Sequence, residues 1–346
     1  MYVLDQNEVV FGCRKGLVAA VKEMDRSGAE AVMLISTCIP EVIGEDLECM
    51  IREMQPDIKA KLSIVRIGHF KCNSHPSGIW KTLVAYGDLM EDADTRSDTV
   101  NVLGRGPDGD HPPMPKLLKE LSDRGFRLRF LAPGSGIDDF IAAPDASLNL
   151  VVSQFMNPLA DMMSQRYGIS AVSLHETYDV EGIDLLHSSV ADALNISWDS
   201  EFKEQREKAA ALQKQAADVF RGTQFVMTRE NMLMPLPLAA YLSELGMIPA
   251  LIHMEEYYPD DKKWAKVLIE KGHDPLVCHM VNEETDAKAI ELVGPDISFG
   301  EIPRSSGKIR CVCDMQDLYG CIGYERTIAL LERMLTVLNR RNGTEA

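Results

Sequence analysis

Short apolar, β-rich runs alternate along this chain with longer stretches in which apolar residues recur three, four or seven positions apart. Leu117, Leu118 and Leu121 show the second pattern, which places all three on one face of a helix. Strands that alternate with amphipathic helices are typical of βαβ units, whose strands form parallel sheets. The pattern predicts an α/β chain with strands at residues 31–36, 62–67, 99–103, 128–131, 148–152, 171–174, 225–228, 249–253, 276–280, 297–299 and 310–313.

Two segments interrupt this alternation and indicate domain limits. Residues 200–221 form a charged, alanine-rich helix that has no strand partner, and residues 104–113 form a loop dense in glycine, proline and aspartate. The chain is therefore expected to contain three open, Rossmann-like α/β domains. They are residues 1–106, residues 107–199 and, after a connecting helix at 200–221, residues 222–346.

Composition narrows the class of partner. The 346 residues contain 36 Lys and Arg against 53 Asp and Glu, which gives a net charge of −17 and argues against a nucleic-acid or anionic-membrane surface. The start of the sequence has no signal-peptide pattern, and its apolar runs are shorter than the roughly 20 residues of a membrane span. A cytoplasmic protein is expected. Its eight cysteines then serve as core residues, nucleophiles or metal ligands.

A glycine pattern in the loop at 104–113 has the spacing of a dinucleotide-binding fingerprint. Gly104, Gly106 and Gly109 follow an expected strand, but Pro107 and two acidic residues occupy the same loop. Few backbone N–H groups would face a pyrophosphate there, and the carboxylates would repel it. The sequence therefore predicts no NAD(P) binding.

Cys38 occupies a position that favours chemistry. It follows the expected strand at 31–36 and precedes a helix, and open α/β sheets place their ligands at this edge. The helix dipole would also stabilise a thiolate there. A structural role for Cys38 remains the alternative, although a buried structural cysteine would more naturally lie within the strand.

The residues around Cys38 carry a family resemblance. Val10-Phe-Gly12, followed by Ser36-Thr-Cys-Ile-Pro-Glu-Val-Ile-Gly-Glu-Asp-Leu47, resembles the cluster-binding segment of the nitrogenase component 1 superfamily. That superfamily includes nitrogenase subunits, cofactor-assembly scaffolds and tetrapyrrole reductases. Further matches occur in the same order at residues 69–78, 99–104, 146–150, 166–169, 242–247, 294–297 and 323–326.

The resemblance implies three Rossmann-like domains around a central cleft, and paired subunits whose interface cysteines hold an iron–sulfur cluster. Cys38 lies where the family has a cluster ligand, and a soft thiolate suits iron in such a cluster. Family members usually begin earlier, with a segment that supplies further cluster cysteines, and this sequence begins after it. A 4Fe–4S cluster would then need Cys13, Cys72 or a partner subunit's cysteines, or it would be absent.

Departures from the family pattern indicate a branch. Ser153 stands where nitrogenase has the cysteine that anchors its metal cofactor, and the histidine expected before the Gly-Tyr motif at residues 323–324 is missing. The resemblance therefore implies no molybdenum–iron cofactor and favours the tetrapyrrole-reducing branch. His75 falls in a loop that faces the family's cleft, where it would donate a proton or ligate a substrate metal. A solvated loop histidine is the alternative, and Cys72 shares that uncertainty.

Other candidates have equally plain structural explanations. Cys311 and Cys313 point to one face of an expected strand, and Cys321 opens the last helix. The three thiols form a soft-metal site or, more simply, Cys311 and Cys313 are small side chains that line a buried strand. Cys49 and Cys278 are expected in the core. His253 and Glu255 suggest a metal pair, but a solvated loop is the simpler explanation.

Together these features predict a subunit of a nitrogenase-like reductase. It would receive electrons from an ATP-dependent iron–sulfur reductase and pass them through a shared cluster at Cys38 to a substrate, such as a tetrapyrrole, in the cleft. Its partner would be a second component 1-like subunit or another copy of itself. The alternatives are a non-catalytic metallocofactor scaffold, a partner of a fuller paralogue, and a cluster-free ligand-binding module.

Overall fold

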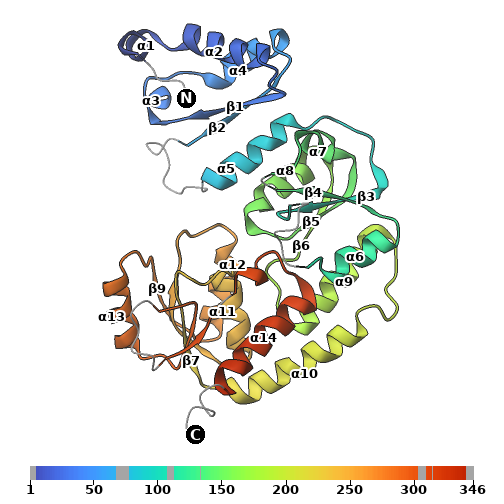
Figure 1. The fold of residues 1–346 in the computed structure, drawn as a ribbon, viewed down its shortest axis with the longest axis vertical. Coiled ribbons are helices and arrows are strands. Elements are labelled where there is room, and N and C mark those ends of the chain that lie inside the picture. Colours follow the sequence, from blue (N-terminus) through green and yellow to red (C-terminus); the bar gives the residue numbers. More distant parts are fainter. Residues whose placement is uncertain are drawn as a thin grey trace. The chain divides into compact units, whose positions relative to one another are not determined.

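The computed structural model describes residues 5–67, 78–106, 113–132, 134–302, 309–313 and 315–339 (Figure 1). Cys72, His75 and Gly109 lie outside these ranges. The chain divides into two compact units, the first made of residues 1–107 and 129–171 and the second of residues 108–128 and 172–346. The three-domain limits expected from the sequence stay a prediction.

The first sheet contains two parallel strands, β1 (Ala31–Ser36) and β2 (Lys61–Arg66), paired from Ala31 with Lys61 to Ser36 with Arg66. The helices around this sheet are α1 (Gln6–Phe11), α2 (Arg14–Arg26), α3 (Cys38–Val42), α4 (Leu47–Met54), η1 (Gln55–Asp57), α5 (Gly78–Ala85) and η2 (Tyr86–Leu89). Helix α2 packs against β1, whereas α4 and α5 pack against β2. Asp5 and Glu8 form a capping box at the start of α1, which satisfies backbone N–H groups of its first turn.

The second sheet contains four strands, which are β3 (Arg96–Leu103), β4 (Arg127–Leu131), β5 (Ala146–Val151) and β6 (Ser170–Ser173). They lie in the order β4-β3-β5-β6. The central strands β3 and β5 are buried along most of their length, and a 2.9 Å hydrogen bond joins the amides of Asn101 and Asn149, which lie opposite each other. The helices that accompany this sheet are α7 (Ile137–Ala142), η3 (Ala143–Asp145), η4 (Gln154–Met156) and α8 (Asn157–Tyr167), whereas α6 (Lys116–Asp123) and α9 (Val180–Leu194) belong to the second unit.

The third sheet contains five strands, which are β7 (Gln224–Met227), β8 (Ile248–His253), β9 (Leu276–Cys278), β10 (Ile297–Phe299) and β11 (Arg310–Val312). They lie in the order β11-β10-β7-β8-β9, and the described pairs are parallel. The rings of Phe225 and Phe299 meet edge to face at 5.7 Å inside the core. The helices are α10 (Lys203–Phe220), α11 (Pro235–Glu244), α12 (Asp261–Glu270), α13 (Glu283–Val293), η5 (Gln316–Leu318) and α14 (Gly323–Asn339).

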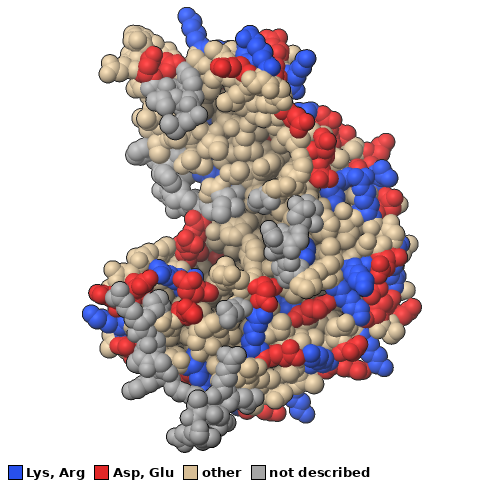
Figure 2. Space-filling model, viewed as in Figure 1, with Lys and Arg blue, Asp and Glu red and all other residues tan. Residues whose placement is uncertain are grey.

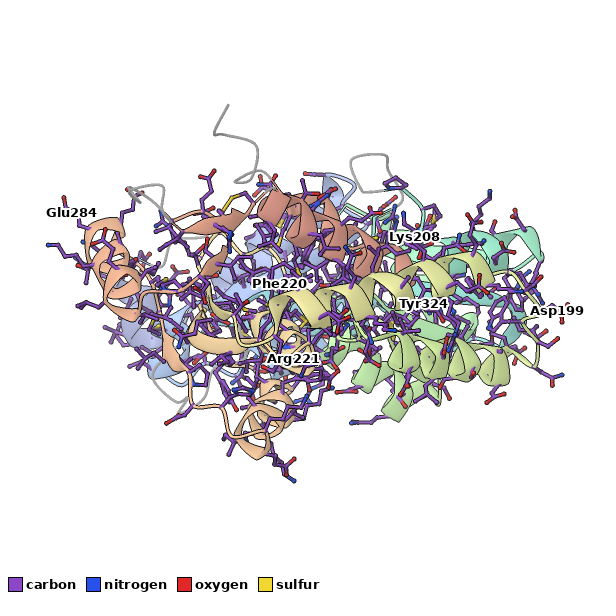
Figure 3. The ribbon with its side chains drawn as sticks, turned by 90° about the horizontal axis from the view of Figure 1, so that it is seen from below. Asp199, Lys208, Phe220, Arg221, Glu284 and Tyr324 are labelled. Atoms are coloured by element: carbon purple, nitrogen blue, oxygen red, sulfur yellow. A yellow bond between two sulfur atoms is a disulfide. The ribbon has the colours of Figure 1, made fainter. Side chains whose placement is uncertain are left out.

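The helix expected at residues 200–221 is α10, which packs along α14 within the second unit (Figure 3). Phe220 is buried at its end, while Lys208 forms a 2.7 Å ion pair with Glu332. Figure 2 shows basic side chains interspersed among acidic ones on the face that carries α10. Exposed pairs such as Lys208 with Glu332 contribute little to stability individually.

The expected alternation of strands and helices is confirmed. Each expected strand is present, and its ends shift by three residues at most. β3 begins early, at Arg96, because its first residues are exposed and polar and give no apolar signal. Among the described helices, none combines the length and the apolar character that crossing a bilayer requires.

Candidate functional site

Cys38 lies at the carboxyl end of a parallel strand, as expected. β1 ends at Ser36, Thr37 is the N-cap residue of the short helix α3, and Cys38 is the first residue of that helix. Its side chain is half-buried, while the neighbouring Ile35 and Ile39 are exposed. The thiol therefore lies at a surface where apolar side chains face solvent.

Cys13 occupies a different environment. It is the residue before α2 and only 3% exposed, and its backbone N–H donates a 2.6 Å hydrogen bond to Glu45 Oε1. Burial, followed by the charge and hydrogen bond of Glu45, raises the pKa of the Cys13 thiol to about 11. The thiol is therefore neutral near pH 7.

Glu45 connects the two cysteine segments. Its own backbone N–H donates to the Pro40 carbonyl, which fixes it to the end of α3, seven positions after Cys38. Its carboxylate reaches Gly12, where a Cβ would lie 2.7 Å from Oε1. Gly12 also has a φ of +91°, a conformation that requires glycine, whereas the Glu45 side chain could shift to relieve the contact. This close approach holds the Cys13 segment against the loop after α3.

The donors present fit an iron–sulfur cluster in kind. Cys38 and Cys13 offer soft sulfur ligands from two segments joined through Glu45. Within the part of the chain that the structure describes, no three His, Cys, Asp or Glu side chains gather closely enough to hold a metal ion. Cys72 and His75 lie outside the described residues, so their roles stay predictions.

Ser153 follows β5 and is buried against Gly104, the residue after β3. Gly104 has a φ of +98°, and a Cβ there would lie 2.4 Å from the Cβ of Ser153. The glycine that begins the fingerprint-like spacing thus serves a close crossing of two strand ends. The predicted absence of NAD(P) binding and the predicted role of Ser153 remain untested.

Three other cysteine predictions need correction or refinement. Cys49 was expected in the core, but it is half-buried and its Sγ lies 3.4 Å from Glu53 Oε1. Cys278 is also half-buried, at the end of β9. Cys311 and Cys313 form a disulfide, which neither the soft-metal nor the buried-strand interpretation anticipated. Their same-face spacing was the signal that could have suggested it.

His253, one member of the suggested metal pair with Glu255, has a structural role. His253 Nδ1 accepts a 2.8 Å hydrogen bond from the backbone N–H of Met280, and burial lowers its pKa. The ring of His279 lies 5.5 Å away, and its Nδ1 is 3.1 Å from the Glu255 carbonyl oxygen. These contacts fix the loops after β8 and β9.

Sequence reasoning missed a buried polar cluster after β6. Arg326, the last residue of the matched segment 323–326, donates hydrogen bonds of 2.7 Å to the His175 carbonyl and 2.6 Å to the Thr177 carbonyl. Glu176 pairs with Lys263, and hydrogen bonds from His175 and Lys263 outweigh its burial and lower its pKa. The Gly-Tyr-Glu-Arg segment was the sequence signal that could have revealed this cluster, because its arginine holds the loop after β6.

Comparisons with known proteins agree with this architecture. The family model for nitrogenase component 1 type oxidoreductases matches residues 1–339. One subunit of the light-independent protochlorophyllide reductase of Trichormus variabilis is 22% identical over 187 residues, which cover 50% of this chain and 37% of that relative. The match thus spans well under two thirds of the relative's length.

Solved structures show the same fold. "Nitrogenase Cp1 at pH 6.5" superposes with a TM-score of 0.70 at 18% identity, covering 99% of this chain and 83% of that chain. "Nitrogenase Cp1 at pH 5" gives a TM-score of 0.60 at 15% identity, covering 98% and 77%. Because the family model extends over nearly the whole sequence, this chain belongs to the nitrogenase component 1 type oxidoreductase family.

Proposed function

We propose that this chain is one subunit of a nitrogenase-like reductase complex. It receives electrons from an ATP-dependent iron–sulfur reductase and delivers them, through a cluster held in part by Cys38, to an organic or metallo-organic substrate of tetrapyrrole size. The family match over residues 1–339 supports the reaction class. The relative named for protochlorophyllide reduction supports the substrate class.

The observation that carries this proposal is the arrangement around the two linked cysteines. Val10 and Phe11, which are 70% and 84% exposed, directly precede the Cys13 segment. Ile39 and Val42, also exposed, lie on α3 after Cys38. Exposed apolar side chains beside two thiols favour coverage by a second subunit, since burying apolar surface is favourable. That subunit, either another copy or a component 1-like partner, supplies the remaining cluster ligands.

The residues of this chain have different roles at the proposed cluster. A bound iron–sulfur cluster supplies one-electron transfer. Cys38 offers a thiol at the surface, and Cys13 offers one from the interior after it loses its proton. Glu45 holds the Cys13 backbone in place through its 2.6 Å hydrogen bond. Ser153 provides a hard neutral oxygen, which is a poor ligand for iron in a sulfur-bridged cluster, so no molybdenum–iron cofactor is proposed.

Iron and acid-labile sulfide analysis of anaerobically purified complex tests the cluster. Cys38→Ala should lose the iron, the sulfide and the brown absorbance. Cys49→Ala is the matched control, because Cys49 is also half-buried in the same unit but lies on α4. The proposal fails if Cys38→Ala retains wild-type iron, or if the wild-type complex binds neither iron nor sulfide.

His75 is proposed to donate a proton to the substrate. His75→Gln should leave iron and sulfide content unchanged while turnover falls by about 10²-fold or more, the usual cost of losing a general acid. Unchanged turnover would assign His75 to the solvated loop instead.

A further inference from the structure

A groove of about 550 Å³ opens in the second unit at the carboxyl ends of β7, β10 and β11. Gly300 and Glu301 follow β10, and Cys313 and Met315 follow β11. Ligands of open parallel sheets bind at this edge. The groove is far from Cys38 in the sequence and lies in the other unit, so it is distinct from the proposed cluster position.

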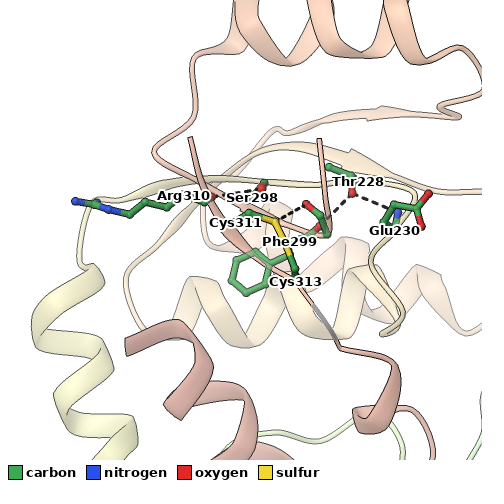
Figure 4. The surroundings of a disulfide bond; sticks show 8 residues. Thr228, Glu230, Ser298, Phe299, Arg310, Cys311 and Cys313 are labelled. Atoms are coloured by element: carbon green, nitrogen blue, oxygen red, sulfur yellow. Dashed lines mark hydrogen bonds between the residues drawn. A yellow bond between two sulfur atoms is a disulfide. The ribbon is translucent and has the colours of Figure 1, made fainter. Parts of the chain in front are cut away.

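The Cys311–Cys313 disulfide lies at this edge (Figure 4). The two cysteines are two positions apart, with Cα atoms 5.7 Å from each other. A disulfide stabilises a fold mainly by restricting the conformations of the unfolded chain, and this effect grows with the number of residues in the loop that it closes. A ring this small contributes little of that stabilisation. Its presence is therefore better explained by the chemistry of its sulfurs.

The two sulfur atoms differ in their surroundings. Cys313 lines the groove, while the Cys311 Sγ lies 3.4 Å from the Gly300 carbonyl oxygen. Gly300 is itself fixed, since its N–H donates a 2.9 Å hydrogen bond to the Val312 carbonyl. Its φ is +89°, and a Cβ would lie 2.4 Å from Thr228 Oγ1, so only glycine fits this crossing. Cys313 thus faces the groove and Cys311 faces a rigid carbonyl.

We propose that Cys311–Cys313 is a redox-active disulfide that exchanges with small thiols entering this groove. A thiolate attacks Cys313 Sγ, the Cys311–Cys313 bond breaks, and the Cys311 thiolate takes a proton from solvent. The resulting Cys311 thiol donates to the Gly300 carbonyl, which lies within reach in the oxidised state. A second thiol then resolves the mixed disulfide at Cys313. The protein disulfide gains two electrons and two protons, and two thiols become one small-molecule disulfide.

The charge of the groove selects among thiols. Of the described residues that line it, Glu230, Glu301 and Asp317 carry carboxylates and Arg333 carries the basic group. Arg333 is paired with Asp317 through a 2.7 Å hydrogen bond, and Glu230 is paired with Arg229 at 3.2 Å, so Glu301 is the carboxylate of the described lining that these two pairs do not use. The carboxylate of Glu301 repels anionic thiols, so the proposed site takes neutral or cationic small thiols.

Single-cysteine variants locate the attacked sulfur. With cystamine as the probe, Cys313 in the variant Cys311→Ser should form its mixed disulfide about tenfold faster than Cys311 in Cys313→Ser, because access controls exchange. Mass spectrometry of the peptide from residue 311 to residue 326 measures both rates. Cys321→Ser is the control and should leave the wild-type disulfide reducible. Equal rates, or a faster Cys311, would overturn the proposal.

The wild-type chain tests the thiol class without any substitution. Folded protein treated with dithiothreitol should gain the two thiols of this disulfide without urea. Cysteamine should reduce it faster than 2-mercaptoethanesulfonate at equal thiolate concentration, and added salt or Glu301→Gln should narrow that difference. The assignment would be contradicted if reduction required denaturant, or if the reduction rate did not depend on thiol charge, on salt or on Glu301.

Discussion

The two cysteine regions of this protein occupy the same place in their sheets but differ in chemistry. Cys38 follows β1 and Cys313 follows β11, each at the carboxyl end of a parallel strand. Cys38 has exposed apolar neighbours and is linked through Glu45 to a buried thiol. Cys313 is bonded to Cys311 and lines the groove that also holds Glu301. Both proposals therefore place chemistry at the carboxyl end of a parallel strand, and the surroundings of each cysteine distinguish the two proposed reactions.

The supporting structure differs as well. The β1–β2 sheet has a small core that includes Val32, Leu47 and Met50, and it leaves Phe11 in solvent. The five-stranded sheet buries Phe225 and Phe299 completely. A cluster that is shared with a partner needs an open face, whereas a disulfide that exchanges with small thiols needs a rigid edge. Paired substitutions in the two regions test this contrast.

The largest expected effect concerns the core beneath the disulfide. Phe225→Ala should lower the free energy of unfolding by about 3–5 kcal/mol, because it leaves a cavity against Phe299. Phe11→Ala is the matched control at an exposed position and should change it by less than about 0.5 kcal/mol. Urea unfolding followed by circular dichroism measures both. A similar loss of unfolding free energy in the two variants would show that Phe11 is as closely packed as Phe225.

The second prediction concerns the buried thiol. At pH 8 a thiol with a pKa of about 11 has roughly 100-fold less thiolate than one with an ordinary pKa near 9, so iodoacetamide should modify Cys13 correspondingly slowly. Glu45→Gln keeps an oxygen for the Cys13 N–H but removes the charge, and should lower the pKa and speed the reaction. An unchanged rate in Glu45→Gln would assign the slow reaction to burial alone.

The same thiol predicts how stability responds to alkali. Because the folded state raises the pKa of Cys13, it binds more protons than the unfolded state between about pH 9 and 11. The contribution of Cys13 to stability is therefore complete below pH 9 and is lost as pH rises through 11. Cys13→Ser should flatten this part of the stability profile, and a profile that keeps its wild-type slope would contradict the shift.

The next prediction compares two glycines with positive φ, one in each region. Gly44 has a φ of +80° and open space around it, so Gly44→Ala should cost about 1 kcal/mol from backbone strain alone. Gly300→Ala adds a clash with Thr228 and the Asn231 backbone, and should cost about 2 kcal/mol or more. Equal unfolding midpoints for the two variants would show that the backbone around Gly300 accommodates a Cβ at little cost.

These contrasts also show what the sequence could predict. The strands followed from apolar runs, because burial on both faces of a parallel sheet requires them. The placement of Cys38 at a strand end followed from the same pattern. The hydrogen bond from Cys13 to Glu45 could not be predicted, because it joins positions 32 apart through the turn after α3. The Cys311–Cys313 disulfide was missed because same-face spacing fits a metal site, a buried strand or a disulfide equally well.

The smallest expected change in stability belongs to the exposed apolar residues, where the contrast is sharpest. Phe11→Ser with Val42→Ser should leave the free energy of unfolding within about 0.5 kcal/mol of wild type, since both side chains already face solvent. The same double variant should lose association with its partner subunit or second copy, because that surface would no longer bury apolar area. Leu292→Ser is the matched control, since Leu292 is 88% exposed but lies on α13 in the second unit. Sedimentation equilibrium of the purified complex separates the cases. If Leu292→Ser dissociates the complex and the double variant does not, the subunit interface lies away from Cys38, and the shared cluster would have to be abandoned.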